Sequence, residues 1–379
     1  MTSLFGSLRS VAAPALSTKA LNRALLARQM LLERAPAGVQ EALERLVGLQ
    51  AQIGNSPYLA LWSRLDGFDP EDLASLVRCR RVVRLALMRS TIHSVTARDA
   101  LVLRPLTAAV HNRALSGNYA RGLSGVDAAA VVRAARELVE LEPMTFSSLG
   151  RELAARFPGC DGYTLAMAAR SWLPLVQVPP RGLWGRGGPA AHTTIEAWVG
   201  SPVEPDPSTE ALVLRYLAGY GPASVADMKL WAGMNRLGDV FERLRPRLRT
   251  FRDPNGIELF DLPDAPRPDA DTPAPPRFLP EYDNALIGFA DRSRVVPPAN
   301  SGGLLARGAL LTGTVLVDGF LRARWTADMK RSSARLDVEP FRRLSKRSAA
   351  AVGREGGRLL AFVAPEAADP DVRIAPVDI

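Results

Sequence analysis

The order of the predicted elements repeats along this chain of 379 residues, and this repetition constrains the fold more than any single motif does. In the first round, helices are predicted to begin at Ser17, after Pro36 and at Asp69, because capping residues or prolines precede apolar residues at helical spacing. Two β-rich runs, 82–88 and 91–97, follow and are joined by a very short turn. Three helices followed by a two-stranded hairpin are the order of a winged-helix unit.

The same order recurs twice without obvious sequence identity. In the second round, predicted helices over 127–142, from Thr145 and after Gly162 precede a hairpin with a Gly- and Pro-rich tip. In the third round, Ser224 and Asp227 resemble a capping box, and an Asn-Gly turn between two β-rich runs predicts a hairpin. The chain is therefore predicted to hold three winged-helix units.

The C-terminal part of the chain has a different pattern. A Pro- and Asp-rich stretch predicts a linker, and Asp318-Gly319 between two β-rich runs predicts another hairpin. We therefore predict an α+β fold of three tandem winged-helix motifs with a C-terminal β-barrel-like domain. The predicted parts are a flexible N-terminal extension (1–17), winged-helix units (18–126, 127–203 and 204–265), a linker (266–276) and the β-rich barrel-like domain (277–379).

Composition narrows the class of protein. Basic residues exceed acidic residues by 48 to 39, a formal net charge of +9 that favours a polyanionic partner, although arginine-rich chains also result from GC-rich coding. Cys79 and Cys160 lie far apart and the three histidines form no ligand pattern, so we predict no metal site and no cofactor. No apolar run is long enough for a membrane helix. We expect a soluble, monomeric protein of the cytoplasm that is nucleoid-associated when it binds DNA.

Arginines gather where a winged helix would meet nucleic acid. One group lies on the third helix of the first round and on its hairpin, and another lies at the tip of the second hairpin. The predicted phosphate-contacting residues are Arg78, Arg80, Arg81, Arg84, Arg89, Arg181 and Arg186. A solvated basic helix end is the alternative for the first group.

The segment Gln50-Ala51-Gln52 follows the second predicted helix. If that helix continued, Gln50 would extend the buried stripe that starts at Val39, and Gln52 would face nearly the opposite side. Gly54 indicates that the helix ends first, and in an extended chain residues two apart project to the same side. Two amides could then converge on one site. A buried structural Gln50 beside a surface Gln52 is the alternative.

Five segments occur in a specific order: GLQAQ, MRSTIH, GPASVADMKLWAGM, FLPEYDNALIGFADRSRV and VLVDGFLRARW. Together they resemble the winged-helix crosslink-repair DNA glycosylases of the AlkZ/YcaQ-like family, from about residue 18 to the C-terminus. The resemblance implies three tandem winged-helix motifs with a C-terminal β-barrel, and it places the family's catalytic Gln-x-Gln motif on Gln50 and Gln52. Broader-acting relatives carry Gln-x-Asp instead. The chain has glutamine at position 52 and therefore resembles the AlkZ-like branch of the family.

This resemblance implies a monofunctional enzyme that hydrolyses the N-glycosidic bond of N7-alkylated guanine in double-stranded DNA, including bulky natural-product adducts or interstrand crosslinks, in DNA repair or antibiotic self-resistance. Such a guanine is cationic and leaves easily, so neutral amides that orient water suffice. Asn55, Thr91 and His93 are candidates for lining the site, with a structural role as the alternative for His93. Polar residues from Glu281 to Arg292 are expected to form a hydrogen-bonded junction. The main alternative function is a non-catalytic winged-helix transcription regulator, and a protein-binding scaffold is a third.

Overall fold

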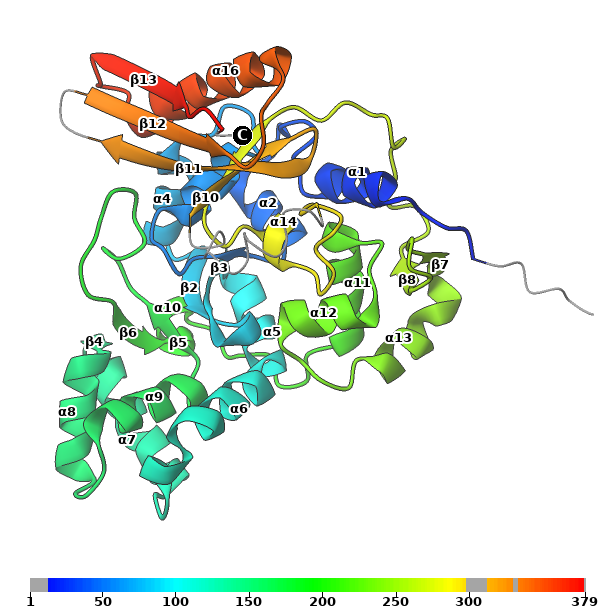
Figure 1. Ribbon diagram of the computed structural model, residues 1–379. Coiled ribbons are helices and arrows are strands. Elements are labelled where there is room, and N and C mark those ends of the chain that lie inside the picture. Colours follow the sequence, from blue (N-terminus) through cyan, green and yellow to red (C-terminus); the bar gives the residue numbers. More distant parts are fainter. Residues whose placement is uncertain (1–12, 298–311, 330–332, 378–379) are drawn as a thin grey trace, which may run out of the picture.

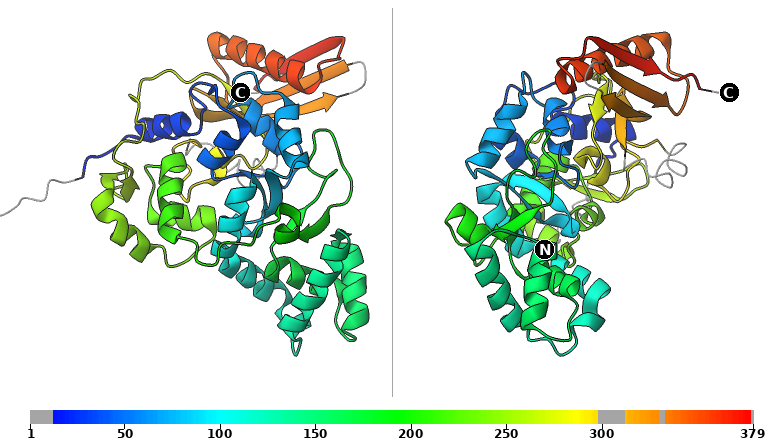
Figure 2. Two further views of the ribbon diagram at one scale, coloured as in Figure 1. Left: turned by 180° about the vertical axis from the view of Figure 1, so that it is seen from behind. Right: turned by 90° about the vertical axis from the view of Figure 1, so that its left-hand side faces the viewer.

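The computed structural model describes residues 13–297, 312–329 and 333–377. Figure 1 shows an elongated molecule with a C-terminal sheet at one end and a group of three helices, α7 to α9, at the other. The N-terminal helices and those of the third round lie between them, and the two views of Figure 2 agree with this arrangement. Of the predicted N-terminal extension, residues 1–12 lie outside the described residues. The rest is held in place, because the Leu16 amide donates to the Arg252 carbonyl at 2.8 Å.

The helices of the first round begin at the predicted capping residues. Ser17 caps α1 (Thr18–Arg28), and Asp69 opens α4 (Pro70–Arg78) with a capping box. Between them lie α2 (Val39–Arg45) and α3 (Ser56–Trp62). Helix α3 is missing from the predicted order, because six of its seven residues are buried and the sequence therefore shows no polar face.

The hairpins predicted for the first and second rounds belong to one sheet. Its strands are β1 (Leu49–Gln50), β2 (Val82–Ala86), β3 (Ile92–Thr96), β4 (Met144–Thr145), β5 (Leu175–Gln177) and β6 (Ala191–Thr194), in the order β1-β3-β2-β5-β6-β4. Strands β2 and β5 are antiparallel, with Arg84 opposite Gln177 and Leu85 opposite Val176. This pairing satisfies edge N–H and C=O groups that two free wings would leave open. The predicted number of winged-helix motifs is thus not confirmed, because the first two hairpins are not separate wings.

The second round is connected to the first by α5 (Ala97–Leu106) and α6 (Ala108–Tyr119), which the predicted order also lacks. Its own helices agree with the prediction. They are α7 (Ala128–Leu141), α8 (Phe146–Arg156) and α9 (Gly162–Trp172), and they share a separate small core. The end of the predicted second hairpin is instead a short helix, α10 (Ile195–Val199).

The third round matches its prediction closely. Its elements are α11 (Thr209–Tyr220), α12 (Val225–Ala232), α13 (Gly238–Leu244), β7 (Arg249–Arg252) and β8 (Glu258–Asp261). The predicted capping box of α12 is confirmed, since the Asp227 amide donates to Ser224 Oγ at 3.1 Å and the Ser224 amide donates to Asp227 Oδ2 at 2.9 Å. The predicted linker contains neither helix nor strand and contacts α1, where Arg28 Nη2 donates to the Pro266 carbonyl at 3.1 Å. The domain boundaries stay predictions.

The C-terminal domain is an open sheet rather than a barrel in the part that the structure describes. Its elements are β9 (Arg277–Leu279), α14 (Asn284–Ile287), β10 (Gly313–Val317), β11 (Phe320–Met329), β12 (Ser333–Pro340), α16 (Lys346–Val363) and β13 (Asp369–Ile374). The strand order is β13-β12-β11-β10-β9, and within the described ranges β9 and β13 do not pair. The barrel prediction is therefore wrong for these residues. Helix α16 covers one face of the sheet and buries its apolar side chains. The sheet therefore does not have to close into a barrel to remove these side chains from water.

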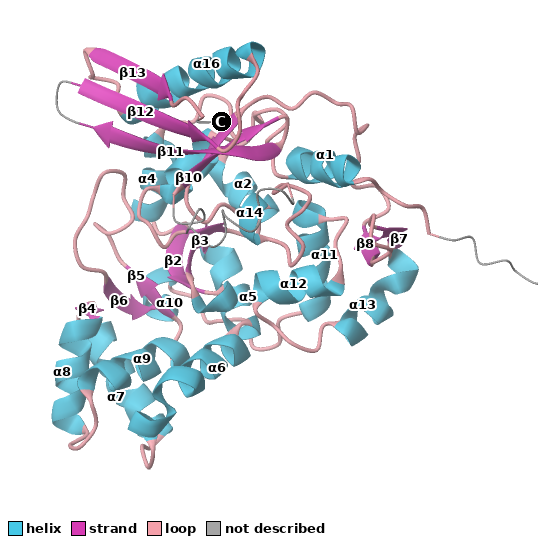
Figure 3. Ribbon diagram, viewed as in Figure 1, coloured by secondary structure: helices cyan, strands magenta, loops and turns pink. Residues whose placement is uncertain are grey.

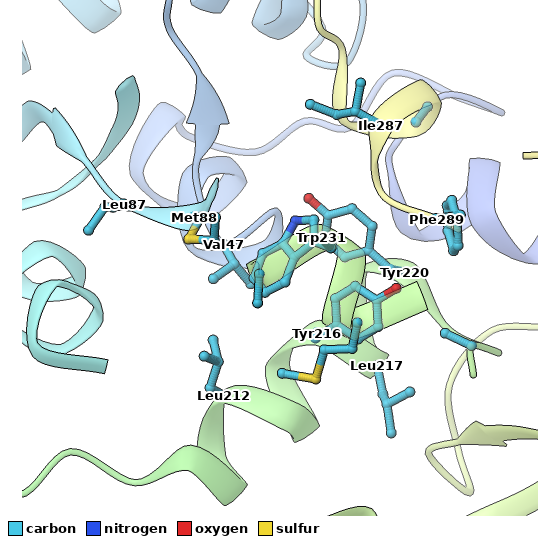
Figure 4. Packing of buried hydrophobic residues seen from close by; sticks show 14 of the residues in the cluster. Val47, Leu87, Met88, Leu212, Tyr216, Leu217, Tyr220, Trp231, Ile287 and Phe289 are labelled. Carbon is cyan, nitrogen blue, oxygen red and sulfur yellow. The ribbon is translucent and has the colours of Figure 1, made fainter. Parts of the chain in front are cut away.

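The largest core cluster joins the first round to the third (Figure 4). Tyr216 and Tyr220 of α11 stack at 5.0 Å, and both rings pack against Trp231 of α12, at 5.0 and 5.4 Å. Met88, at the end of the β2–β3 hairpin, lies in the same cluster. The tip of this hairpin therefore packs against α12 and is partly buried, whereas the tip of a free wing would lie in solvent.

Candidate active site

The chain reaches Gln50 through a bend that glycine permits. After α2, Val47 and Gly48 adopt φ angles of 53° and 90°. A Cβ on Gly48 would lie 2.4 Å from Val95 Cγ1, so the bend passes directly against β3. The chain then pairs with β3, with Leu49 opposite Ser94. Strand β1 is thus a two-residue edge strand that starts at a fixed point.

The two glutamines hold different parts of the hairpin beside them. The Gln50 side chain is 7% exposed, and its Oε1 accepts a hydrogen bond from Arg89 Nη2 at 2.8 Å. Gln52 is exposed, and its Oε1 accepts from the Ile92 amide at 3.3 Å. Both amide oxygens thus bind the same short segment, residues 89–92, while neither Nε2 group donates to another described residue. The burial of Gln50 and the exposure of Gln52 agree with the alternative given in the sequence analysis, although both oxygens bind the same hairpin segment, and the catalytic role of the two residues stays a prediction.

The turn that binds Gln50 has an unusual backbone. Arg89 and Ser90 have φ angles of 54° and 59°, and the Thr91 amide donates to the Met88 carbonyl at 3.1 Å, which is the pattern of a type I′ hairpin turn. Asn and Gly dominate such turns because a side chain strains this region. Arg89 is partly buried and bonds to Gln50. Its predicted phosphate contact is thus replaced here by a contact within the candidate site.

Arg84 requires a similar correction. Its side chain is 2% exposed, and its Nη2 donates to the Ala51 carbonyl at 2.8 Å. Burial lowers its pKa to about 10, so the guanidinium keeps its charge at neutral pH. A residue inside the sheet cannot reach a DNA phosphate. Arg84 therefore supports the glutamine segment from within the protein.

The three residues predicted to line the site lie around the glutamine segment. His93 pairs with Gln50 across the two strands, and its Nδ1 faces the Thr91 carbonyl at 2.9 Å. Burial lowers the pKa of His93 to about 3, with the nearby Arg89 charge acting in the same direction, so the imidazole is neutral. The Thr91 hydroxyl donates to the Met88 carbonyl at 3.1 Å. Asn55 accepts from the Gly185 amide at 3.3 Å and so links the site to the second hairpin.

The remaining predicted phosphate contacts lie away from the glutamines or at the loop beside them. Arg78 ends α4, and Arg80 and Arg81 precede β2 at the end opposite the Arg89-Ser90 turn. Arg78 pairs with Glu71, Arg80 lies over the Trp198 ring at 4.1 Å, and Arg81 is exposed. Arg181 and Arg186 lie in the loop between β5 and β6, with Arg186 exposed. The structure therefore separates these five arginines into two groups.

The polar segment entering the C-terminal domain forms the expected hydrogen-bonded junction. Asp283 and Arg64 make a fully buried two-bond ion pair at 2.7 and 2.8 Å. Asn284 Nδ2 donates to the Gly48 carbonyl at 2.8 Å, and the Ser56 hydroxyl donates to Glu281 Oε2 at 3.0 Å. The segment before and after the glutamines is therefore fixed from the C-terminal side as well.

The sequence reasoning missed the residues that hold the turn. His111 Nδ1 lies 3.0 Å from Ser90 Oγ, and Arg170 Nη2 donates to the Ser90 carbonyl at 2.7 Å. Both come from helices of other segments, α6 and α9, so no local pattern could reveal them. No group of three or more side chains suited to metal binding occurs in the described ranges. In the same ranges, no helix has the length and apolar content needed to cross a bilayer.

Comparisons with known proteins identify a family and a similar fold. The family model for the AlkZ-like DNA glycosylases matches residues 43–362, which include both glutamines. The fold is similar to that of the DNA glycosylase AlkZ of Streptomyces sahachiroi, with a TM-score of 0.76, 20% sequence identity, and coverage of 95% of this chain and 100% of that chain. No curated protein sequence matches this chain. Since the family model covers most of the sequence, the chain belongs to the AlkZ-like DNA glycosylases.

Proposed function

We propose that this glycosylase hydrolyses the N-glycosidic bond of N7-alkylated guanine in double-stranded DNA without forming a covalent enzyme intermediate. The observation that carries the proposal is the pair of neutral amides, Gln50 and Gln52, held on one short hairpin segment with both Nε2 groups free of described partners. No carboxylate or lysine bonds to either amide within the described residues. The site is therefore suited to a lesion that leaves without strong acid or base assistance.

The chemistry starts from the positive charge of the lesion. The bond between the sugar C1′ and guanine N9 breaks, and its electron pair moves to the base, which becomes neutral. The sugar is left as an oxocarbenium-like cation. A water oxygen then bonds to C1′ and loses a proton to solvent. The glutamine amides position the reacting groups, and the neutral His93 beside Gln50 supplies no acidic proton at neutral pH.

The proposed DNA contacts are made by those predicted arginines that are exposed in the structure. Arg80 and Arg81 are exposed at the far end of β2, and Arg186 is exposed on the loop that Asn55 contacts. Each phosphate neutralised should contribute about 0.9 to the slope of log K against log salt. Replacing Arg80 and Arg81 together by Gln should therefore lower that slope by up to about 1.8 in fluorescence-anisotropy titrations. An unchanged slope would place both residues outside the DNA interface.

The activity is tested on duplexes that carry one N7-methylguanine. Released base is measured by mass spectrometry, and abasic sites are measured by alkaline cleavage. Gln50→Ala and Gln52→Ala should each slow excision by roughly a hundredfold or more while leaving the DNA dissociation constant within about threefold. Gln40→Ala, a change to another glutamine that lies on α2, is the matched control and should excise normally. Full activity in both site variants would remove the glutamines from the mechanism.

The range of lesions is tested separately. Bulky N7 adducts of natural products and N7-linked interstrand crosslinks should also be released, in keeping with a role in DNA repair or antibiotic self-resistance. Denaturing gels detect unhooking as strand separation. Tight binding of undamaged operator-like sequences without base release would instead favour a transcription regulator.

A further inference from the structure

The Arg89-Ser90 turn is bonded to three helices and to the glutamine segment. Ser90 contacts α6 through His111 and α9 through Arg170, as described above. Arg89 Nη1 donates to the Trp231 carbonyl in the last turn of α12, and Arg89 Nη2 donates to Gln50 Oε1 at 2.8 Å. A turn with two strained φ angles persists only when its surroundings fix it. The contacts of this turn therefore hold Arg89 and Ser90 in their strained backbone conformation.

Arg89 connects Gln50 to a rigid support. The last carbonyls of a helix have no partner within the helix, and they carry the negative end of its dipole. The guanidinium binds one of these carbonyls and the Gln50 oxygen with two nitrogens of one planar group. Gly233, which ends α12, packs on the Arg89 backbone so closely that a Cβ would lie 3.2 Å from the Arg89 Cα. Helix α12 thus fixes the position of both the turn and its side chain.

The consequence is an oriented amide. With Gln50 Oε1 bonded to Arg89, the planar amide group directs its Nε2 hydrogens away from the guanidinium. Gln52 repeats this pattern, since its oxygen binds the Ile92 amide and its nitrogen has no described partner. Building on the proposed function, we propose that Arg89 is a positioning residue. It holds Gln50 so that the amide serves the substrate as a hydrogen-bond donor.

Variants of Arg89 test this assignment in the full-length chain. Arg89→Met keeps an unbranched side chain and the same backbone strain but removes both hydrogen bonds. We expect the single-turnover excision rate to fall by about a hundredfold at saturating protein, with DNA affinity little changed, because a small misplacement of a catalytic group has that effect. Arg89→Lys keeps the charge, but one ammonium group cannot bind both acceptors. Its excision rate should therefore lie between those of the unaltered chain and of Arg89→Met.

Arg113 offers a matched control. It is exposed, and its Nη2 donates to the Gly233 carbonyl at the same helix end without contacting Gln50. Arg113→Met should excise at the rate of the unaltered chain. An excision rate for Arg89→Met within about threefold of the unaltered chain would overturn the proposal. Equal losses in the Arg89 and Arg113 variants would also overturn it, since the effect would then belong to the helix end.

Gln50→Glu tests the donor role. A carboxylate still accepts from Arg89 but has no N–H group, so this variant should be as slow as Gln50→Ala. A Gln50→Glu rate equal to that of the unaltered chain would overturn the donor assignment.

A spectroscopic measurement keeps the proposal separate from the proposed function. The Gln50 side-chain amide signal, assigned by its loss in Gln50→Ala, should shift in Arg89→Met and stay in place in Arg113→Met. This holds even if the unaltered chain excised no N7-methylguanine. An unshifted amide signal in Arg89→Met would refute the positioning role on its own.

Discussion

The burial of all three histidines predicts a strong acid dependence of stability. His93, His111 and His192 are 2%, 0% and 3% exposed. Burial lowers their pKa values to about 3, about 2 and about 4, and neighbouring arginine charges act in the same direction. In the unfolded chain each imidazole has its ordinary pKa of about 6.5. The unfolded state therefore binds more protons than the folded state once the pH falls below about 6.5.

The direction and size of the effect follow from this difference. The stabilisation is fully present above the unfolded pKa, and it is lost as the pH falls from about 6.5 toward the folded values. At about pH 5.5 each unfolded histidine holds about 0.9 proton, while the folded histidines hold almost none. Relative to about pH 7.5, each histidine therefore lowers the free energy of unfolding by about 1.4 kcal/mol, and the three together lower it by about 4 kcal/mol. That is a large part of the stability of an ordinary domain.

Urea unfolding at about pH 7.5, 6.5 and 5.5, followed by tryptophan fluorescence, measures this loss. A fall of less than about 1 kcal/mol between the first and last conditions would refute the burial argument. His192→Phe is the matched variant. His192 stacks on Phe146 at 3.9 Å, and its two buried ring nitrogens have no hydrogen-bond partner among the described residues. The substitution should therefore keep stability at neutral pH and reduce the loss to about 3 kcal/mol.

Three further predictions concern the site and its supports. Because the pKa of His93 is about 3, the single-turnover excision rate should vary less than about twofold between about pH 6.5 and 8.5, and a bell-shaped profile would contradict this. Gly48→Ala should lower the free energy of unfolding by at least about 2 kcal/mol in urea titrations, since its Cβ would meet Val95 at 2.4 Å and its φ is +90°. Asp283→Asn breaks the fully buried pair with Arg64 and should lower the free energy of unfolding by about 3–5 kcal/mol, whereas a loss under about 1 kcal/mol would indicate that water enters the junction.

Local signals in the sequence predicted local structure well. Ser17, Asp69 and Ser224 cap helices as expected, because a capping hydrogen bond joins residues only two or three positions apart. The Asp318-Gly319 turn has φ angles of 50° and 77°, as an Asp-Gly hairpin requires. In each case the residues that determine the geometry are neighbours in the chain.

Features set by distant residues could not be predicted in this way. The pairing of β2 with β5 joins residues 84–85 to residues 176–177, and neither strand's own sequence favours a free edge or a paired one. The sequence predicted that Arg84 and Arg89 are exposed, because a charged side chain is rarely buried unless it has a partner, and their partners could not be identified from the sequence. Their acceptors, the Gln50 amide and the Ala51 carbonyl, lie at and just after the end of β1, more than thirty residues away in the chain. The family resemblance therefore pointed to the glutamines, which stay a predicted site, whereas no local signal pointed to the arginines that bind them.

The end of the β1–β3 ladder explains why the two glutamines are held so firmly. The Ala51 amide donates to the Ile92 carbonyl at 2.7 Å, and the reciprocal bond of an antiparallel pair would run from the Ile92 amide to the Ala51 carbonyl. Here the Ile92 amide donates to Gln52 Oε1 instead, and the Ala51 carbonyl accepts from Arg84 Nη2. Side chains thus replace the last main-chain bond, which lets the chain leave the sheet at Gln52 without unsatisfied polar groups. The backbone that carries the two glutamines therefore keeps the hydrogen bonding of a sheet up to the residue where the chain leaves it.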